Sequence, residues 1–208
     1  IDIWGPYRQA TLSGARYVLT IVDDFSRATW TFLLNHKSQT LHTLTVFFAQ
    51  IHTQFGCKIK TVRTDNGSEF VNSSCAFFFQ NACVCHQRSC THTPQQNGVV
   101  ERKHRHLLQV ARALMFQSYL PNQFWGDSIL TATHIINKLP TSTLNWKSPF
   151  EVLYKSPPTY ESLKTFGCLC FASNFYPEKT KFDSRAFECI FWVYMPNQKG
   201  YYLYDLHN

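Results

Sequence analysis

The sequence contains no apolar run that approaches the roughly 18–20 residues needed to cross a bilayer. Its N-terminus lacks a charged region followed by an apolar one, so no secretory signal is expected. Eight cysteines in a chain without such a signal are expected to be reduced thiols rather than disulfides. These absences favour an intracellular protein and argue against the membrane-spanning and disulfide-stapled classes.

Acidic residues are in the minority, 13 against 20 lysines and arginines, which gives a formal net charge of +7. This charge suits an anionic partner, such as nucleic acid or an acidic membrane surface, although basicity can also serve solubility alone. Aromatic residues are abundant, with 18 Phe and 10 Tyr, so a packed core is expected and disorder is not. The length predicts one domain of about 150 residues with a smaller appendage.

Hydrophobic periodicity predicts a mixed α/β sheet flanked by helices. RYVLTIVD (16–23) and ATWTFLL (28–34) are typical of two strands of a hairpin. Ser38 is a candidate cap for a helix whose apolar stripe runs to residue 55. A strand over 59–64, a helix over 75–82 and a short strand near 84–86 follow. Further helices are expected after Asn97-Gly98 and from Pro121 to Leu139.

The amino-acid composition changes beyond Pro140, where proline and polar residues become frequent. We therefore predict a core over residues 1–140, truncated at its N-terminus, and a connecting segment over 141–165. Short aromatic β-like runs then predict a small β-rich module over 166–208.

Three carboxylates come from three separate elements of the predicted core. Asp65 lies in TDNGSEF, Glu101 lies in TPQQNGVVERKHRHLL with 35 residues between them, and Asp2 lies in IDIWGP. Carboxylate oxygens are the ligands that Mg²⁺ and Mn²⁺ prefer, and phosphoryl transfer commonly uses two such ions. Each acid alone also has an ordinary explanation: a turn for Asp65 and a helix-dipole partner for Glu101. Asp23 and Asp24 are competing candidates beside a strand.

Basic and polar residues around Glu101 are candidate contacts to DNA. Arg102, Lys103 and Arg105 would neutralise phosphates, and Gln95, Gln96 and Asn97 in the preceding loop would act as donors. A solvated basic helix face and a plain connecting loop are the alternatives. Cysteines 83, 85 and 90 with His86 fit no structural zinc pattern.

The sequence around the three acids resembles the integrase catalytic core of copia-type retrotransposons, in the retroviral integrase superfamily. IKTVRTDNGSEF and HTPQQNGVVERKHRHLL are similar to the integrase signature, and SPFEVLY, LKTFGCLCF, KFDSRAFECIF and KGYYLYDL are similar to the stretch that follows it. The resemblance covers nearly the whole chain. Cys83 departs from the pattern, since it stands where the family usually has glycine.

This resemblance implies a ribonuclease H-like fold with Asp2, Asp65 and Glu101 as catalytic residues that bind two Mg²⁺ or Mn²⁺ ions. It also implies DNA 3′-end processing and strand transfer on element ends and a target duplex. Further implications are a homo-oligomer, no membrane association, action in the nucleus, and a chain that is part of a Pol polyprotein. Asp23 and Asp24 would then be structural acids of the hairpin.

Three other functions remain open at this point. The chain could be a decayed remnant that binds nucleic acid without turnover, a ribonuclease H-like nuclease acting on RNA in hybrids, or a protein-interaction module. The sequence of the motifs argues against a nuclease acting on RNA in hybrids, and the basic helix argues against a protein-interaction module.

Overall fold

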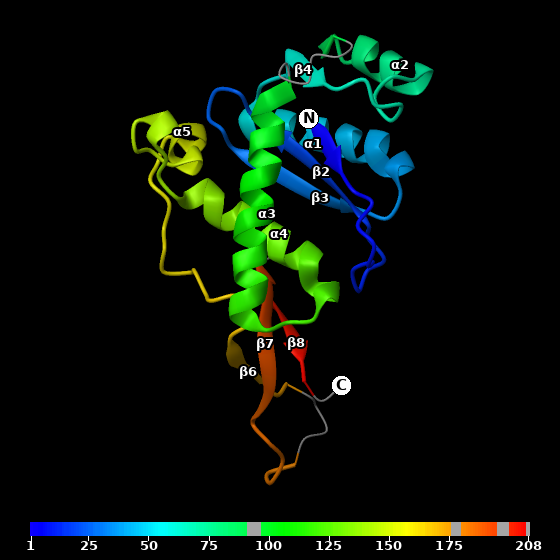
Figure 1. Cartoon of the computed structure of the whole chain (residues 1–208). Coiled ribbons are helices and arrows are strands. Elements are labelled where there is room, and N and C mark those ends of the chain that lie inside the picture. The colour runs from blue at the N-terminus through cyan, green and yellow to red at the C-terminus, as the bar shows by residue number, and fades with distance from the viewer. Residues whose placement is uncertain (91–96, 176–179, 195–199, 207–208) are drawn as a thin grey trace.

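The computed structural model describes residues 1–90, 97–175, 180–194 and 200–206. The chain forms an α/β part and a smaller all-β part, which lies at the lower end of the molecule in the view of Figure 1. The mixed α/β class and the β-rich C-terminal module predicted from the sequence are both confirmed.

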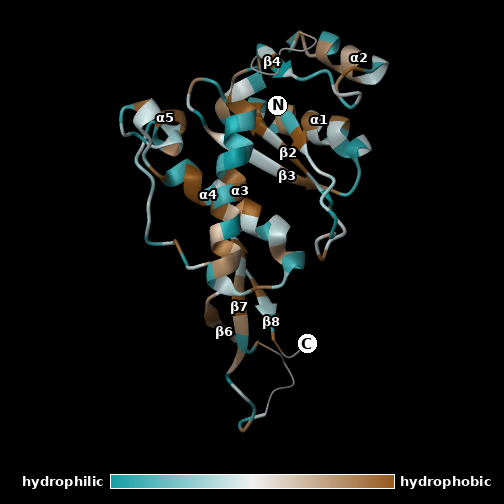
Figure 2. Cartoon of the chain, in the orientation of Figure 1, coloured by the Kyte–Doolittle hydropathy of each residue, from teal (hydrophilic) through white to brown (hydrophobic). Residues whose placement is uncertain are grey.

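Strands β1 (Asp2–Trp4), β2 (Tyr17–Val22) and β3 (Thr29–Leu34) form an antiparallel sheet in that order. Asp2 pairs with Thr20, and Val22 pairs with Thr29. Residues of β2 alternate between two buried layers, with Leu19 in the cluster under α1 and Val18 in the cluster under α3 and α4. The sheet is therefore covered on both faces, and apolar residues concentrate there (Figure 2).

Helix α1 (Thr40–Phe55) follows a single 3-10 turn, η1 (Lys37–Gln39), and ends at Gly56 in the left-handed region. Its apolar stripe packs against the sheet as predicted, with Leu44 and Phe47 buried. The prediction that Ser38 caps this helix is wrong. Ser38 lies inside η1, and the cap position of α1 is Gln39, whose side chain makes no capping bond.

Strands β4 (Thr61–Thr64) and β5 (Cys85–Arg88) form a parallel pair, connected by helix α2 (Ser73–Asn81). Asn72 caps α2 by accepting a hydrogen bond from the Cys75 backbone N–H. The amino group of Ile1 donates to the Arg63 carbonyl oxygen at 2.7 Å, which brings the start of β1 against β4.

Replacing Cys83 with glycine is expected to stabilise the protein by about 1 kcal/mol. Cys83 has a φ of 55°, in the left-handed region where a Cβ is strained. Its side chain is exposed, so little packing is lost on substitution. Urea unfolding of the glycine variant measures the gain. The serine variant keeps the Cβ and should show no gain, and equal stabilities of the two variants would contradict the prediction.

Helices α3 (Gly98–Ser118) and α4 (Trp125–Lys138) cover the second face of the sheet, with the 3-10 turn η3 (Asn122–Phe124) between them. Leu107 and Ala111 of α3 pack with Ile129 and Ala132 of α4 against Val18. Leu139 ends α4, as the sequence predicted.

A short helix, α5 (Pro149–Tyr154), lies in the segment that was predicted to be an irregular connection. Ser148 accepts a hydrogen bond from the Glu151 N–H, and proline occupies the first helical position. Ser-Pro-Phe-Glu is therefore an ordinary helix start, with serine at the cap and proline at the first helical position, and it corrects the prediction of an irregular connection. A 3-10 turn, η4 (Ser142–Leu144), precedes it.

Strands β6 (Leu169–Ser173), β7 (Ala186–Tyr194) and β8 (Tyr201–Asp205) form the antiparallel C-terminal module. The module packs on the α/β part through Trp192 against Phe124 and through Tyr194 against His134. Gly167 meets the end of α3 so closely that a Cβ there would lie 2.3 Å from the Cβ of Ser118. Only glycine fits this contact.

Acidification is expected to weaken the packing of this module on α4. Burial, followed by the charge of Lys138, lowers the pKa of His134 from 6.5 to about 4. The folded state then binds fewer protons than the unfolded chain between those values. Stability is therefore retained above pH 6.5 and lost as the pH falls from 6.5 towards 4.

Because the His134 ring is only partly buried, we expect a loss of ~1–2 kcal/mol between neutral pH and about pH 5. Urea unfolding at both pH values measures it. His134→Gln should flatten this part of the pH dependence, and an unchanged slope in that variant would contradict the assignment to His134.

Within the described residues, none of the helices combines the length and the apolar character needed to span a bilayer.

Candidate active site

Asp2 is the first residue of β1, where it pairs with Thr20 of β2 and lies near His104 of α3. Its Oδ1 accepts a hydrogen bond from the Ile3 N–H at 2.7 Å, and its side chain is 19% exposed. Oδ2 lies 3.4 Å from Nδ1 of His104 on α3. Both carboxyl oxygens therefore have a neighbour that restricts their orientation.

Asp65 directly follows β4 and begins the turn that leads to α2. Its Oδ1 accepts the Gly67 N–H at 3.1 Å, which fixes the carboxyl group over the turn. Burial raises the pKa of Asp65, and the negative charges of Asp2 and Glu69 raise it further. The fold thus brings Asp2 and Asp65 close enough to repel each other, as expected for two acids of one site.

Glu101 lies in the first turn of α3 with an exposed side chain. Asn97, the N-cap of α3, and His104 lie four residues before and three residues after Glu101, on one side of the helix. The Asn97 side chain donates to the Ile1 carbonyl oxygen at 3.4 Å, and His104 approaches Asp2. The helix side that carries Glu101 therefore faces the strand that carries Asp2.

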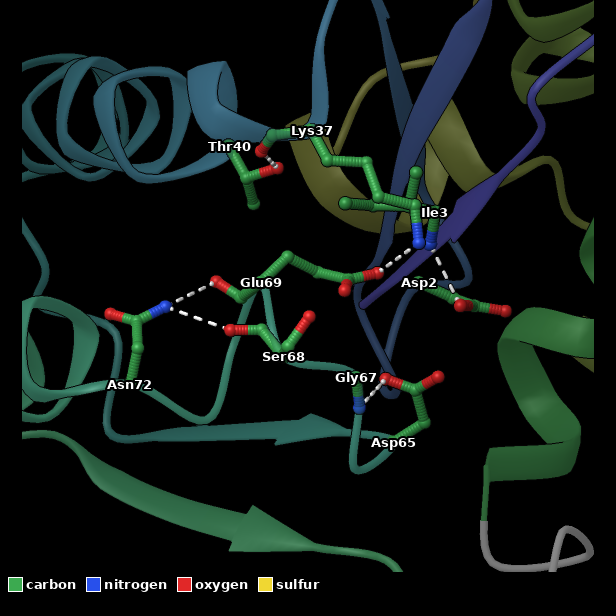
Figure 3. Close-up of polar contacts among 9 residues, drawn as sticks. All are labelled: Asp2, Ile3, Lys37, Thr40, Asp65, Gly67, Ser68, Glu69 and Asn72. Atoms are coloured by element: carbon green, nitrogen blue, oxygen red, sulfur yellow. Dashed lines mark hydrogen bonds and ion pairs between the residues drawn. The ribbon is translucent and has the colours of Figure 1, made fainter.

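Glu69 is a fourth carboxylate, which the sequence reasoning missed. It forms an ion pair with Lys37 at 2.9 Å, and its side chain is only 7% exposed (Figure 3). Gly67 leaves room for it, since a Cβ there would lie 2.8 Å from the Glu69 carboxyl carbon. The Asp65-x-Gly-x-Glu spacing could have suggested this contact, whereas the Lys37 partner lies 32 residues away and could not be foreseen.

The donor chemistry of this site fits a hard divalent cation. Carboxylate oxygens of Asp2 and Asp65 are the ligands such ions prefer, and a cation would offset both the burial and the neighbouring negative charges that raise the pKa of Asp65. Over the described ranges 1–90, 97–175, 180–194 and 200–206, no three His, Cys, Asp or Glu side chains are grouped to hold a metal. Asp2 and Asp65 thus lie near each other, and the helix that carries Glu101 approaches Asp2 through His104.

The predicted DNA-binding residues occupy different environments. Arg102 and Arg105 are exposed, whereas Lys103 is partly buried, and burial together with Arg27 lowers its pKa. Asn97 is only 6% exposed and contacts Ile1, so its burial argues against the DNA-donor role predicted for it. Gln95 and Gln96 lie outside the described residues.

The competing candidates have structural roles. Asp23 accepts hydrogen bonds from the N–H and hydroxyl of Ser26, and Asp24 pairs with Arg27, so both acids hold the β2–β3 turn. His86 contacts the Thr64 hydroxyl at 2.9 Å. Cys83, Cys85 and Cys90 are exposed.

Comparison with known proteins gives a consistent family. The family described as "Integrase core domain" matches residues 1–94, and the "Retroviral polymerase SH3-like domain" matches residues 168–208. The chain is 33% identical over 204 residues to the retrovirus-related Pol polyprotein from transposon TNT 1-94 of Nicotiana tabacum. It is 34% identical over 200 residues to that from transposon RE2 of Arabidopsis thaliana.

These alignments cover 98% and 96% of this chain, which spans only 15% and 14% of the two relatives' lengths. A chain in the cryoEM structure of the simian T-cell lymphotropic virus intasome in complex with PP2A regulatory subunit B56 gamma matches with a TM-score of 0.57 at 16% identity. That match covers 92% of this chain and 70% of the other, and it shows the shared fold. Residues 1–94 thus match an integrase core and residues 168–208 a retroviral polymerase SH3-like domain, and over almost its whole length the chain is similar to retrovirus-related Pol polyproteins of plant transposons.

Proposed function

We propose that this chain carries out integrase-type DNA 3′-end processing and strand transfer at a site formed by Asp2, Asp65 and Glu101. The observation that carries the proposal is that Asp65 lies near enough to Asp2 for the Asp2 charge to raise its pKa, while His104, one turn beyond Glu101 on α3, lies 3.4 Å from Asp2. The integrase core family and the Pol polyprotein relatives support the same role.

The three carboxylates would hold divalent ions, Mg²⁺ or Mn²⁺, which supply charge stabilisation to phosphoryl transfer when bound. In the first step, water adds to a phosphorus near the element end and the bond from that phosphorus to the 3′-oxygen breaks. The element strand keeps this oxygen, which gains a proton to become a 3′-hydroxyl, and the terminal nucleotides leave with a 5′-phosphate. In the second step, that 3′-oxygen bonds to a target phosphorus, and the target's own 3′-oxygen leaves and gains a proton. The carboxylates orient the reacting groups, and no covalent bond to the protein is required.

DNA binding is proposed to use the exposed side chains of Arg102 and Arg105, which lie within one turn of Glu101 on α3. Their contacts would go to phosphates and so would tolerate many sequences. The relative with the shared fold is part of an intasome, which supports action as an oligomer on DNA ends. The nucleus is the proposed site of integration.

The test is strand transfer by the full 208-residue chain with Mg²⁺ or Mn²⁺. A labelled duplex with 3′-hydroxyl ends is incubated with a plasmid, and joined products are measured. Metal-dependent joining supports the proposal. Binding of the duplex without any joined product would support the second candidate, a decayed remnant. That candidate is favoured by the absence of a three-ligand group within the described residues.

A parallel assay compares cleavage of an RNA–DNA hybrid with cleavage of duplex DNA. Preference for the hybrid would overturn integration in favour of a nuclease of the same fold.

A further inference from the structure

Two residues of α3 and the residue at its N-cap lie along one side of the helix. Asn97, Glu101 and His104 are separated by four and three residues, which is the spacing of neighbours on one helical face. The outer two contact consecutive residues at the start of the chain: Asn97 contacts the carbonyl oxygen of Ile1, just before β1, and His104 contacts the carboxyl group of Asp2, the first residue of β1, each at 3.4 Å. Glu101 lies between the two contacts.

Both outer residues are buried where they touch the strand. Asn97 is 6% exposed, and the His104 side chain is 12% exposed. The Nε2 atom of His104 is buried without a hydrogen-bond partner, so the ring's polar contact in the structure is the one that Nδ1 makes with Asp2. A buried nitrogen without a partner costs free energy, so the contact of Nδ1 with Asp2 is the polar interaction that favours this ring position.

The geometry points to Asn97 and His104 as positioning residues that fix the rotation of α3 about its own axis against β1. Through that rotation they set where Glu101 lies relative to Asp2, and the inference rests on the proposed function in this respect. The two polar contacts are directional, so they add an angular restraint to the apolar packing of Leu107 and Ala111.

The magnitude supports a functional effect. A rotation of about 20° moves a side chain at the helix surface, ~5–6 Å from the axis, by about 2 Å. Displacements of this order are enough to separate ligands that must converge on one ion or to misalign a reacting group. Loss of the His104 contact should therefore weaken metal binding even though His104 is not proposed as a ligand.

The direction of the contact supplies a sharp test. Only Nδ1 faces Asp2, and an asparagine amide can take the place of that atom, whereas a glutamine amide takes the place of Nε2. His104→Asn should therefore retain the function, and His104→Gln and His104→Leu should lose it. His106→Leu is the matched control, since His106 is an exposed histidine on the same helix.

Two readouts are measured on the full chain. Mn²⁺ affinity without DNA is followed by electron paramagnetic resonance, and kcat and KM are followed for strand transfer. We expect Mn²⁺ affinity and kcat to fall about tenfold in the Gln and Leu variants, in the range for a residue that orients a ligand. KM for DNA should not change, and the Asn variant and the His106→Leu control should match the wild type.

The inference is overturned if His104→Leu binds Mn²⁺ as the wild type does, or if the Asn variant is as impaired as the Gln variant. Failure of the proposed function has a different signature. A wild-type chain that forms no joined product while its Mn²⁺ affinity still depends on His104 would refute integration and support the positioning role.

Discussion

Replacing Asp65 with asparagine should abolish strand transfer, with a rate loss of at least ~10³-fold. Such a loss exceeds the roughly 10–100-fold effect of residues that only support a metal ligand. The asparagine keeps the size of the side chain and its contact with the Gly67 N–H, but it removes the charge that would bind a cation. Quantifying joined products over a range of Mg²⁺ concentrations measures the loss.

The same substitution should raise the melting temperature near pH 7 in the absence of metal. Burial, Asp2 and Glu69 raise the pKa of Asp65, so its charged form costs stability. That cost appears as the pH rises from the unfolded pKa through the folded one, and it is fully present at neutral pH. An inactive but more stable variant would show that the lost activity is not caused by unfolding.

Asp24→Asn is the matched control for this experiment. It makes the same charge change at an acid whose side chain is 74% exposed and which pairs with Arg27. Its strand-transfer rate should stay close to that of the wild type. A rate for Asp65→Asn within tenfold of this control would refute the assignment of Asp65.

Removing the charge of Lys37 should destabilise the fold more than removing the charge of its partner Glu69. In Lys37→Met, the nearly buried Glu69 carboxylate is left unpaired beside Asp65 and Asp2. We expect a cost of ~2–3 kcal/mol, below the 3–5 kcal/mol of a fully buried pair because Lys37 is partly solvated. In Glu69→Gln, water can solvate Lys37 and a repulsive charge near Asp65 is lost, so the expected cost is below ~1 kcal/mol.

The double variant Lys37→Met/Glu69→Gln should recover most of the loss seen in Lys37→Met, because it contains no unpaired carboxylate at this position. Urea unfolding of the two single variants and the double variant gives the coupling free energy directly. If the lysine variant is no less stable than the glutamine variant, Glu69 does not need Lys37 as its counter-charge.

Local chemistry made much of this fold predictable. The β2–β3 hairpin follows from two β-rich runs around a turn that Asp23 closes through Ser26. The apolar stripe of helix α1 predicts the helix but not its first residue. Lys37 to Gln39 form a 3-10 turn, and Ser38 lies within this turn instead of capping the helix. Helix α5 was missed even though Ser148 and Pro149 are ordinary helix-start residues.

The site was predictable only in part, since its contacts span long distances along the chain. The acids could be named, and the mutual repulsion of Asp2 and Asp65 agrees with a shared site. Sequence spacing could not reveal that Asn97 turns inward to Ile1, that His104 faces Asp2, or that Lys37 pairs with Glu69. Each of these pairs joins segments whose meeting depends on the finished packing of the sheet and α3.

The close contact between Gly167 and Ser118 has a mechanical consequence. Helix α3 is an unbroken rod of 21 residues, about 32 Å long, and Ser118 is its last residue. Its opposite end carries Glu101, next to the strand that bears Asp2 (Figure 1). A tilt of the SH3-like module would therefore push on Ser118 at one end of α3 and would shift Glu101 at the other end of the same helix.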